Sequence, residues 1–338
     1  DMNVTNVQGL TRLFGKISAQ GIHNLARFGL KNWTIATNSD SMEMILDELK
    51  KMPYKATVIE INNMRSFADP LNGLYAEAFK SGQHALVVSH DVLGLTPEIL
   101  SETREFMVQN PSLLMAGWSI DGENGQRNSG FGRKIPWNTA MMYSPEALET
   151  IVKYPLHNFV DNSYIGKIEA EHEGEKMLVQ TGGIEETVII GNLLRYRPQV
   201  PCVAIMPHQN ITRTVKTAVS ERPDGWKEKM FRKVIMSEFY IKVFDAILGI
   251  GFDQFDEALT YIEQDSSGKL IPPVIEKSSL SVALNGFAPE KVLKALAVEV
   301  KLKTEDQELV VEGITRTNGD VLIPTKSGGT ITIPRRIG

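Results

Sequence analysis

The sequence predicts an α/β protein with a mixed, mainly parallel sheet that carries helices on both faces. Two observations support this prediction. Strands of the buried type and amphipathic helices alternate at short spacing from residue 32 to residue 208, which is the pattern of a mainly parallel sheet covered by helices. After residue 298 the sequence becomes alternating and rich in turn residues, which predicts a small region of β-hairpins.

The first half of the chain divides into a helical start followed by alternating strands and helices. Residues 5–30 place apolar side chains near a 3.6-residue period, which predicts a helix. The strands predicted next are 32–40, 55–63, 84–91 and 112–120. The helices predicted between them are 41–52, 70–82 and 96–110. Ser41 and Thr96 begin two of these helices, where their hydroxyls can act as caps.

The second half begins with a loop at 121–137 that is rich in glycine, asparagine and serine, so turns and mobility are expected there. A strand leading into a helix is predicted at 139–154, with Ser144 as the cap. A helix opened by a glycine turn follows at 182–198, and a buried strand at 200–208.

We expect four regions from these elements. They are an N-terminal helical segment over 1–31, an α/β domain over 32–210, a helical region over 211–300 and a β-hairpin tail over 301–338.

The composition is that of an ordinary globular protein, with 42% hydrophobic and 23% charged residues. A net charge of −5 gives no general attraction for nucleic acid or an anionic membrane, although a local basic patch would not show in this total. Lys242 and Asp245 interrupt the apolar stretches, so no membrane span is predicted. Cys202 is the one cysteine, and no basic-then-apolar leader opens the sequence. We therefore expect a cytoplasmic protein.

Three predicted strands end in unusually polar residues, at 37–40, 62–63 and 89–91. In open α/β sheets, ligands bind beyond the carboxyl ends of the strands. One polar strand end alone is what any loop provides. The recurrence of polar ends is what predicts a binding edge.

The segment Ser89-His90-Asp91 ends an apolar run. Mg²⁺ and Mn²⁺ prefer oxygen ligands and often use one or two carboxylates together with substrate phosphates. We therefore predict a divalent cation at Asp91 that bridges a diphosphate. The alternative, a simple turn residue, is less favoured because Thr96 already caps the next helix. His208 is either a second ligand to the ion or a hydrogen-bonded loop histidine.

The order of these segments resembles GT-A (Rossmann-like) glycosyltransferases of the large inverting family 2 type. The segments that carry the resemblance are TIATNSD, VIEINN, LNGLYAEAFKSGQHALVVSHDV, WNTAMMYSPEAL and GGIEETVIIGNLLRY, which together cover about residues 32–208. In that family the first strand ends near an Asn, and the second ends in an acidic or amide residue that contacts the nucleoside. A later strand ends in a D-x-D-type metal site, and an acidic pair opens the helix that holds the catalytic base.

The resemblance implies a donor site built from strand ends and one helix start. Thr37, Asn38 and Asn62 would contact the base and ribose of the nucleotide, and Asn72 and Gly73 its sugar or phosphates.

At the metal, Ser89 stands where the family usually has Asp, which leaves Asp91 as the remaining carboxylate. Ser89 and His90 are assigned to the nucleotide side of this site.

The acidic pair Glu185-Glu186 follows a glycine turn. The resemblance implies that Glu186 is the base, with Glu185 beside it. A displacement at a sugar carbon needs a carboxylate to take the proton from the acceptor hydroxyl, and its leaving diphosphate is stabilised by a cation. Acidic residues in a first helical turn also stabilise the helix dipole, so both interpretations stay open.

Trp118 and Trp137 flank the 121–137 loop. Sugar faces stack on aromatic rings, so either residue could frame the donor or the acceptor. Hydrophobic anchoring of the loop ends is the alternative, and it is favoured for at least one of the two. The loop itself could close over bound nucleotide and exclude water.

The sequence therefore predicts a metal-assisted glycosyltransferase that uses a UDP- or GDP-sugar, an unknown acceptor hydroxyl and Mn²⁺ or Mg²⁺. Inversion is implied by the resemblance alone. A sugar nucleotidyltransferase shares this sheet architecture, but usually has a glycine-rich loop bearing Arg or Lys after the first strand, and ATNSDSMEM has neither. A non-catalytic binding or assembly protein on the same fold is the third reading, because Ser89 departs from the metal motif.

Overall fold

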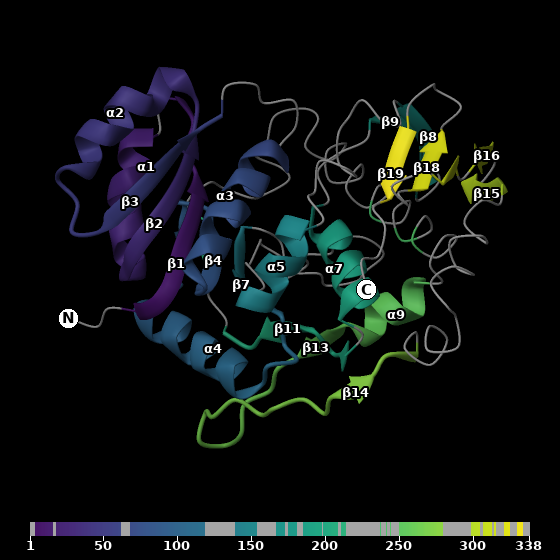
Figure 1. Ribbon diagram of the computed structural model, residues 1–338. Coiled ribbons are helices and arrows are strands. Elements are labelled where there is room, and N and C mark those ends of the chain that lie inside the picture. Colours follow the sequence, from purple (N-terminus) through teal and green to yellow (C-terminus); the bar gives the residue numbers. More distant parts are fainter. Residues whose placement is uncertain are drawn as a thin grey trace.

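A computed structural model of the chain describes residues 4–15, 18–61, 68–118, 139–153, 167–172, 175–180, 185–197, 199–208, 211–213, 237, 241, 244, 250–279, 299–304, 307–312, 314–315, 321–324 and 330–333. Its centre is an eight-stranded sheet with helices packed against it (Figure 1). The strand order is β13-β11-β6-β7-β4-β1-β2-β3.

All strands of this sheet run in one direction except β7, which is antiparallel to both of its neighbours. The strands are β1 (Val4–Arg12), β2 (Leu30–Thr37), β3 (Lys55–Glu60), β4 (His84–Val88), β6 (Met115–Trp118), β7 (Ala140–Tyr143), β11 (Val203–Met206) and β13 (Leu259–Tyr261). The predicted mixed, mainly parallel sheet is confirmed.

Helices cover both faces of the sheet, as predicted. We call one side the α1 face; it carries α1 (Ser18–Leu25), the short helix η2 (Ala26–Phe28), α2 (Ser39–Leu49) and α4 (Pro97–Gln109). We call the other side the α3 face; it carries α3 (Ala68–Ser81), α5 (Pro145–Lys153), α7 (Glu185–Tyr196) and α9 (Phe252–Glu257). Strand β4 shows why two cores form, because its side chains alternate. Ala85 and Val87 pack on the α3 face, whereas Leu86 and Val88 pack on the α1 face.

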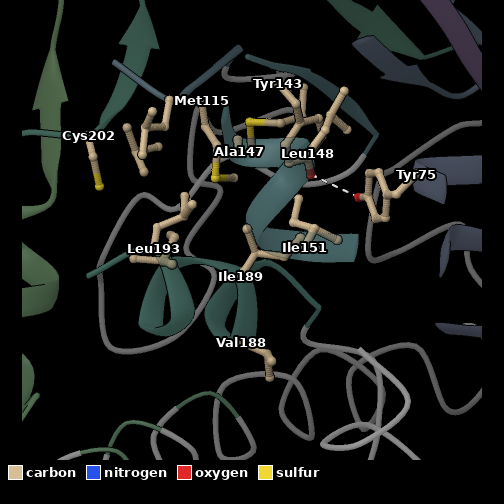
Figure 2. Packing of buried hydrophobic residues seen from close by; sticks show 14 of the residues in the cluster. Tyr75, Met115, Tyr143, Ala147, Leu148, Ile151, Val188, Ile189, Leu193 and Cys202 are labelled. Atoms are coloured by element: carbon tan, nitrogen blue, oxygen red, sulfur yellow. Dashed lines mark hydrogen bonds between the residues drawn. The ribbon is translucent and has the colours of Figure 1, made fainter. Parts of the chain in front are cut away.

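The core of the α3 face joins β7, α3, α5 and α7. Figure 2 shows Ile151 of α5 and Ile189 of α7 in the same layer, and Tyr75 and Tyr143 pointing toward one another. The hydroxyl of Tyr75 donates a hydrogen bond to that of Tyr143 at 3.1 Å. Each fully buried aliphatic side chain of this core contributes about 1.5–3 kcal/mol.

Two of the three predicted helix caps are confirmed. The Thr96 hydroxyl accepts from the backbone N–H of Ile99 at 3.4 Å, and that of Ser144 from Ala147 at 3.1 Å. The prediction for Ser41 is wrong because α2 already begins at Ser39, with Asn38 at the N-cap position.

The prediction of a helical segment over residues 1–31 is wrong, because β1 occupies the centre of the sheet between β2 and β4. The apolar spacing that suggested a helix runs across a strand, a loop and the much shorter α1. A polar residue is tolerated inside this strand because Gln8 donates to the Thr34 hydroxyl at 3.1 Å. Gly9 is required under the ring of Trp33, where a Cβ would lie 2.5 Å from the ring atoms.

The region 211–300, predicted to be helical, is not helical throughout. It contributes α9, but also β13, which extends the sheet beside β11. Two further short strands are β12 (Thr212–Arg213), which pairs with β5 (Val92–Leu93), and β14 (Glu276–Lys277), which pairs with β10 (Gln199–Val200). The described parts of the chain contain no helix long and apolar enough to cross a membrane.

The remaining strands form small antiparallel sheets. They are β8 (Lys167–His172), β9 (Glu175–Gln180), β15 (Glu299–Thr304), β16 (Gln307–Glu312), β17 (Ile314–Thr315), β18 (Val321–Pro324) and β19 (Thr330–Ile333). The last five agree with the predicted β-hairpins after residue 298. The division of the chain into domains stays a prediction.

Candidate functional site at the carboxyl edge of the sheet

The parallel strands bring their carboxyl ends to one edge of the sheet, which is where ligands bind in folds of this class. The tips of β1 and β2 are direct neighbours there, because the backbone N–H of Leu13 donates to the carbonyl of Ala36 at 3.0 Å. The tip of β3 follows, since the N–H of Ile61 donates to the carbonyl of Thr37 at 2.8 Å. Three consecutive strand ends therefore form one continuous edge.

At the tip of β2, two side-chain oxygens are buried without a hydrogen-bond partner among the described residues. They are Oγ1 of Thr37, which is fully buried, and Oδ1 of Asn38. Asn38 is the N-cap residue of α2, yet its side chain makes no capping hydrogen bond. Leaving such a group unpaired costs about 1–3 kcal/mol, so buried unpaired oxygens suggest water or a ligand. These are two of the residues that the resemblance assigns to the base and ribose.

The tip of β4 is enclosed on the α1 face. Asp91 is only 2% exposed, and its Oδ1 accepts a hydrogen bond from the Ser89 hydroxyl. The Arg27 guanidinium donates to the backbone carbonyl of His90. Burial lowers the pKa of Arg27, and the nearby negative charge of Asp91 partly offsets this. The ring of His90 packs against Gly21 of α1, where a Cβ would lie 3.2 Å from Cδ2 of the ring.

His208 follows β11 and is held by a carboxylate of α4. Its Nε2 lies 2.9 Å from Oε2 of Glu102, and its side chain is 12% exposed. Among the described residues, no group of three His, Cys, Asp or Glu side chains is placed to hold a metal ion. Asp91 is buried beside a guanidinium and His208 is bound to Glu102, so these two residues do not fit the divalent cation that the resemblance implies.

On the α3 face, the acidic pair opens α7 as predicted. Glu185 and Glu186 are each only 6% exposed. Burial is the main cause that raises the pKa of Tyr75 and Tyr143, and the charges of both glutamates raise the two pKa values further. Two carboxylates and two phenols therefore lie within electrostatic reach of one another.

Arg12 ends β1 and was missed by the sequence analysis. Its positive charge lowers the pKa of Tyr75, which places it in the same electrostatic environment as the acidic pair. The guanidinium is partly buried and has no hydrogen bond or ion pair within the described part of the chain. After Arg12 the chain turns at Gly15, which has a φ of 71°. The backbone N–H of Gly15 donates a hydrogen bond to the Ser41 hydroxyl at 2.9 Å. The sequence RLFGK, with a glycine between two basic residues, indicates a loop that could bind an anion. The prediction of a helix over these residues left no loop there.

The other predicted residues are spread over the fold. Asn72 lies partly buried in α3, and Gly73 packs on β3, where a Cβ would lie 3.0 Å from a methyl group of Ile59. Trp118 is 1% exposed within the α1-face core, which agrees with the alternative of hydrophobic anchoring. Asn62 and Trp137 lie outside the described residues.

The additional first strand also shifts the resemblance by one strand. TIATNSD is the second strand of the sheet, so Asn38 now stands where the family's second strand ends in an acidic or amide residue. The first-strand tip is instead Arg12 with the following loop, which has the glycine and basic residues that ATNSDSMEM lacks. The criterion that disfavoured a sugar nucleotidyltransferase no longer applies.

No protein-family model matches the sequence, and a search of the curated proteins found no match. Solved structures show a distant likeness. The 4-diphosphocytidyl-2C-methyl-D-erythritol synthase from Anaerococcus prevotii matches with a TM-score of 0.31 and 10% identity, over 46% of this chain and 77% of its own. For mouse xyloside xylosyltransferase 1 the TM-score is 0.29 at 13% identity, over 42% of this chain and 68% of its own.

A third match is glucosyl-3-phosphoglycerate synthase from Mycobacterium tuberculosis, solved with Mn²⁺, UDP-glucose and phosphoglyceric acid. Its TM-score is 0.32 at 10% identity, over 56% of this chain and 65% of its own. Likeness at this level supports no argument about the function of this chain, which has to come from the site itself.

Proposed function

We propose that the protein is a nucleotide-sugar-dependent enzyme, and specifically a glycosyltransferase that moves the sugar of a nucleoside-diphosphate sugar to an acceptor hydroxyl. The observation that supports this most directly is the pair of buried oxygens of Thr37 and Asn38, which have no hydrogen-bond partner among the described residues. The guanidinium of Arg12, at the tip of the neighbouring strand, has no hydrogen bond or ion pair within that same part of the chain. Such acceptors match the N–H and O–H donors of a base and ribose, while a guanidinium matches a diphosphate.

The two faces divide the proposed site. Along β2, Thr37 has the same orientation as Ile35, which packs on the α1 face. Along β1, Arg12 has the orientation of Leu10, which packs on the α3 face. A nucleotide sugar lying across the edge would place its nucleoside over the tip of β2 and its diphosphate near Arg12, with the sugar directed toward the acidic pair.

In the transfer step, the acceptor oxygen forms a bond to the anomeric carbon while the bond from that carbon to the diphosphate oxygen breaks. Glu186 takes the proton of the acceptor hydroxyl. Arg12 stabilises the charge that develops on the leaving diphosphate. The low exposure of Glu185 and Glu186 favours this role, because water is largely excluded around the base.

The test is a binding titration with UDP and GDP, followed by a screen of nucleotide sugars for turnover. Thr37→Val is expected to weaken nucleotide binding at least tenfold. Thr103→Val is the matched control, since the Thr103 hydroxyl is also fully buried without a partner among the described residues but lies in α4. Equal affinity in the two variants, or no nucleotide binding by the wild type, would contradict the proposal.

A sugar nucleotidyltransferase is the second candidate, favoured by the basic glycine loop after β1. Such an enzyme joins a sugar phosphate to a nucleoside triphosphate and releases pyrophosphate. Exchange of labelled pyrophosphate into a nucleoside triphosphate, dependent on a nucleotide sugar and lost in Arg12→Gln, would favour this candidate. Turnover of a nucleotide sugar without such exchange favours the glycosyltransferase.

A further inference from the structure

We infer that Asp91 is the internal counter-charge of Arg27 and does not hold a divalent cation. The inference concerns the one strand tip at which the resemblance places a metal. It rests on the contacts at that tip and is independent of which nucleotide the protein binds.

The surroundings of Asp91 supply donors and a positive charge, whereas a metal site supplies oxygen acceptors. Its Oδ1 accepts from the Ser89 hydroxyl, so the residue that replaces the family's second carboxylate donates a hydrogen bond to Asp91. At 2% exposure, the carboxylate is enclosed by protein groups, and those identified around it donate a hydrogen bond or carry a positive charge.

Arg27 explains why a carboxylate is needed here. Arg27 lies in η2, 63 positions before His90, and its Nη2 donates to the backbone carbonyl of His90. Its guanidinium also lies 5.0 Å from the centre of the Phe28 ring. A partly buried guanidinium requires an opposite charge, because removing one partner of a buried pair leaves the other uncompensated. Asp91 is the residue whose charge acts on Arg27.

His208, the second predicted metal ligand, already contacts a carboxylate of α4. His208 and Glu102 are joined at 2.9 Å, which links the segment after β11 to α4. Strand β12 pairs with β5 immediately after Asp91, with Arg213 opposite Val92. Strand β12 therefore lies beside the residue that follows Asp91.

The test is a Mn²⁺ titration without nucleotide, followed by electron paramagnetic resonance, on the wild type, Asp91→Asn and Asp47→Asn. Asp47 is the control because it is an exposed aspartate paired with Lys50 at 2.7 Å. The expected result is a Mn²⁺ affinity that differs less than twofold between the three proteins, or no Mn²⁺ binding by any of them. The melting temperature is expected to fall by several degrees in Asp91→Asn only.

Two further variants keep the inference testable if Asp91→Asn does not fold. Arg27→Gln/Asp91→Asn removes both charges and is expected to recover much of the lost melting temperature, which a metal ligand would not allow. His208→Ala is expected to leave Mn²⁺ affinity unchanged. A tenfold or greater loss of Mn²⁺ affinity in any folded variant of Asp91 or His208 overturns the inference. Nucleotide binding is measured in a separate titration with a metal chelator present. Absence of nucleotide binding would contradict the proposed function, whereas only the Mn²⁺ affinities bear on the inference about Asp91.

Discussion

The two faces of the sheet place their acidic residues differently. On the α1 face, Asp91 accepts a hydrogen bond from Ser89 and its charge acts on Arg27, and the ring of His208 contacts the carboxylate of Glu102. On the α3 face, Glu185 and Glu186 are adjacent, nearly buried, and close enough to two phenols to raise their pKa values.

From this difference we assign a structural role to the contacts of Asp91 and His208, and the proposed chemistry to the pair Glu185 and Glu186. Compensated charges fix the positions of loops and helices, and they react little. Carboxylates at low exposure beside other titratable groups are candidates for proton transfer. We therefore assign the nucleoside to the strand tip at Thr37 and Asn38, and the proposed proton transfer to the α3 face.

The largest expected effect comes from removing the proposed base. Glu186→Gln should lower the rate of sugar transfer about 10²–10⁴-fold, because general base catalysis contributes that much. Steady-state kinetics with the active nucleotide sugar measure it, and Asp91→Asn is the comparison on the other face. Loss of turnover in Asp91→Asn with full activity in Glu186→Gln would reverse the assignment of the faces.

Trp118→Ala tests whether this side chain belongs to the core or to the binding surface. The side chain is 1% exposed, so its truncation should cost about 3–5 kcal/mol of unfolding free energy. Urea denaturation gives this value, and the variant that remains folded should keep wild-type nucleotide affinity. A variant of normal stability that has lost affinity would place the ring at the ligand instead.

Alkaline pH should destabilise the protein mainly through the α3 face. Burial raises the pKa of Tyr75 and Tyr143 above the ordinary 10.0, and that of Cys202 from 9.0 to about 12. The folded state thus holds these protons more tightly than the unfolded state does. Their contribution is fully present below the unfolded pKa values and is lost as pH rises through the folded ones.

Each such group should lower the free energy of unfolding by about 1.4 kcal/mol per pH unit in that window. Unfolded Cys and Tyr titrate between roughly pH 8 and pH 11. Denaturation midpoints measured across this range would show how steeply the free energy of unfolding falls with pH. Tyr75→Phe/Tyr143→Phe should make this fall less steep. Tyr54→Phe on the α1 face removes a single group with a raised pKa, so it should reduce the pH dependence of stability less. An equal reduction in the two variants would count against the contrast between faces.

The smallest expected effects come from one matched pair of helix caps. Ser144→Ala on the α3 face removes a buried cap with a 3.1 Å hydrogen bond and should cost about 1 kcal/mol. Thr96→Ala on the α1 face removes an exposed cap at 3.4 Å and should cost about 0.5 kcal/mol. Thermal or urea unfolding resolves the two, and the reverse order would show that burial does not set the strength of these caps.

The sequence was sufficient where structure depends on local pattern. The strands β2, β3, β4 and β6, the start of α5 at Pro145 and the acidic start of α7 all lie where spacing, capping residues and apolar runs predict them. The failure at β1 has a physical reason. A strand inside the sheet that carries Gln8, Gly9 and Thr11 lacks an apolar run, and Gln8 is accommodated by Thr34, which belongs to another segment.

The chemistry of Asp91 could not be predicted for a similar reason. Its local sequence shows a carboxylate at a strand tip, and that is true of the fold. What decides its role is Arg27, which donates to the carbonyl of His90 from η2, a helix that packs against α4. Contacts between segments so far apart leave no trace in residue spacing.

The central position of β1 also has a consequence for how the chain assembles. During synthesis this strand emerges ahead of both neighbours, and its pairing with β4 requires residues 84–87. Until then one side of its backbone has no partner, and an unpaired strand edge invites association with other chains. Nascent protein should therefore depend on chaperones more than the stability of the finished sheet would suggest.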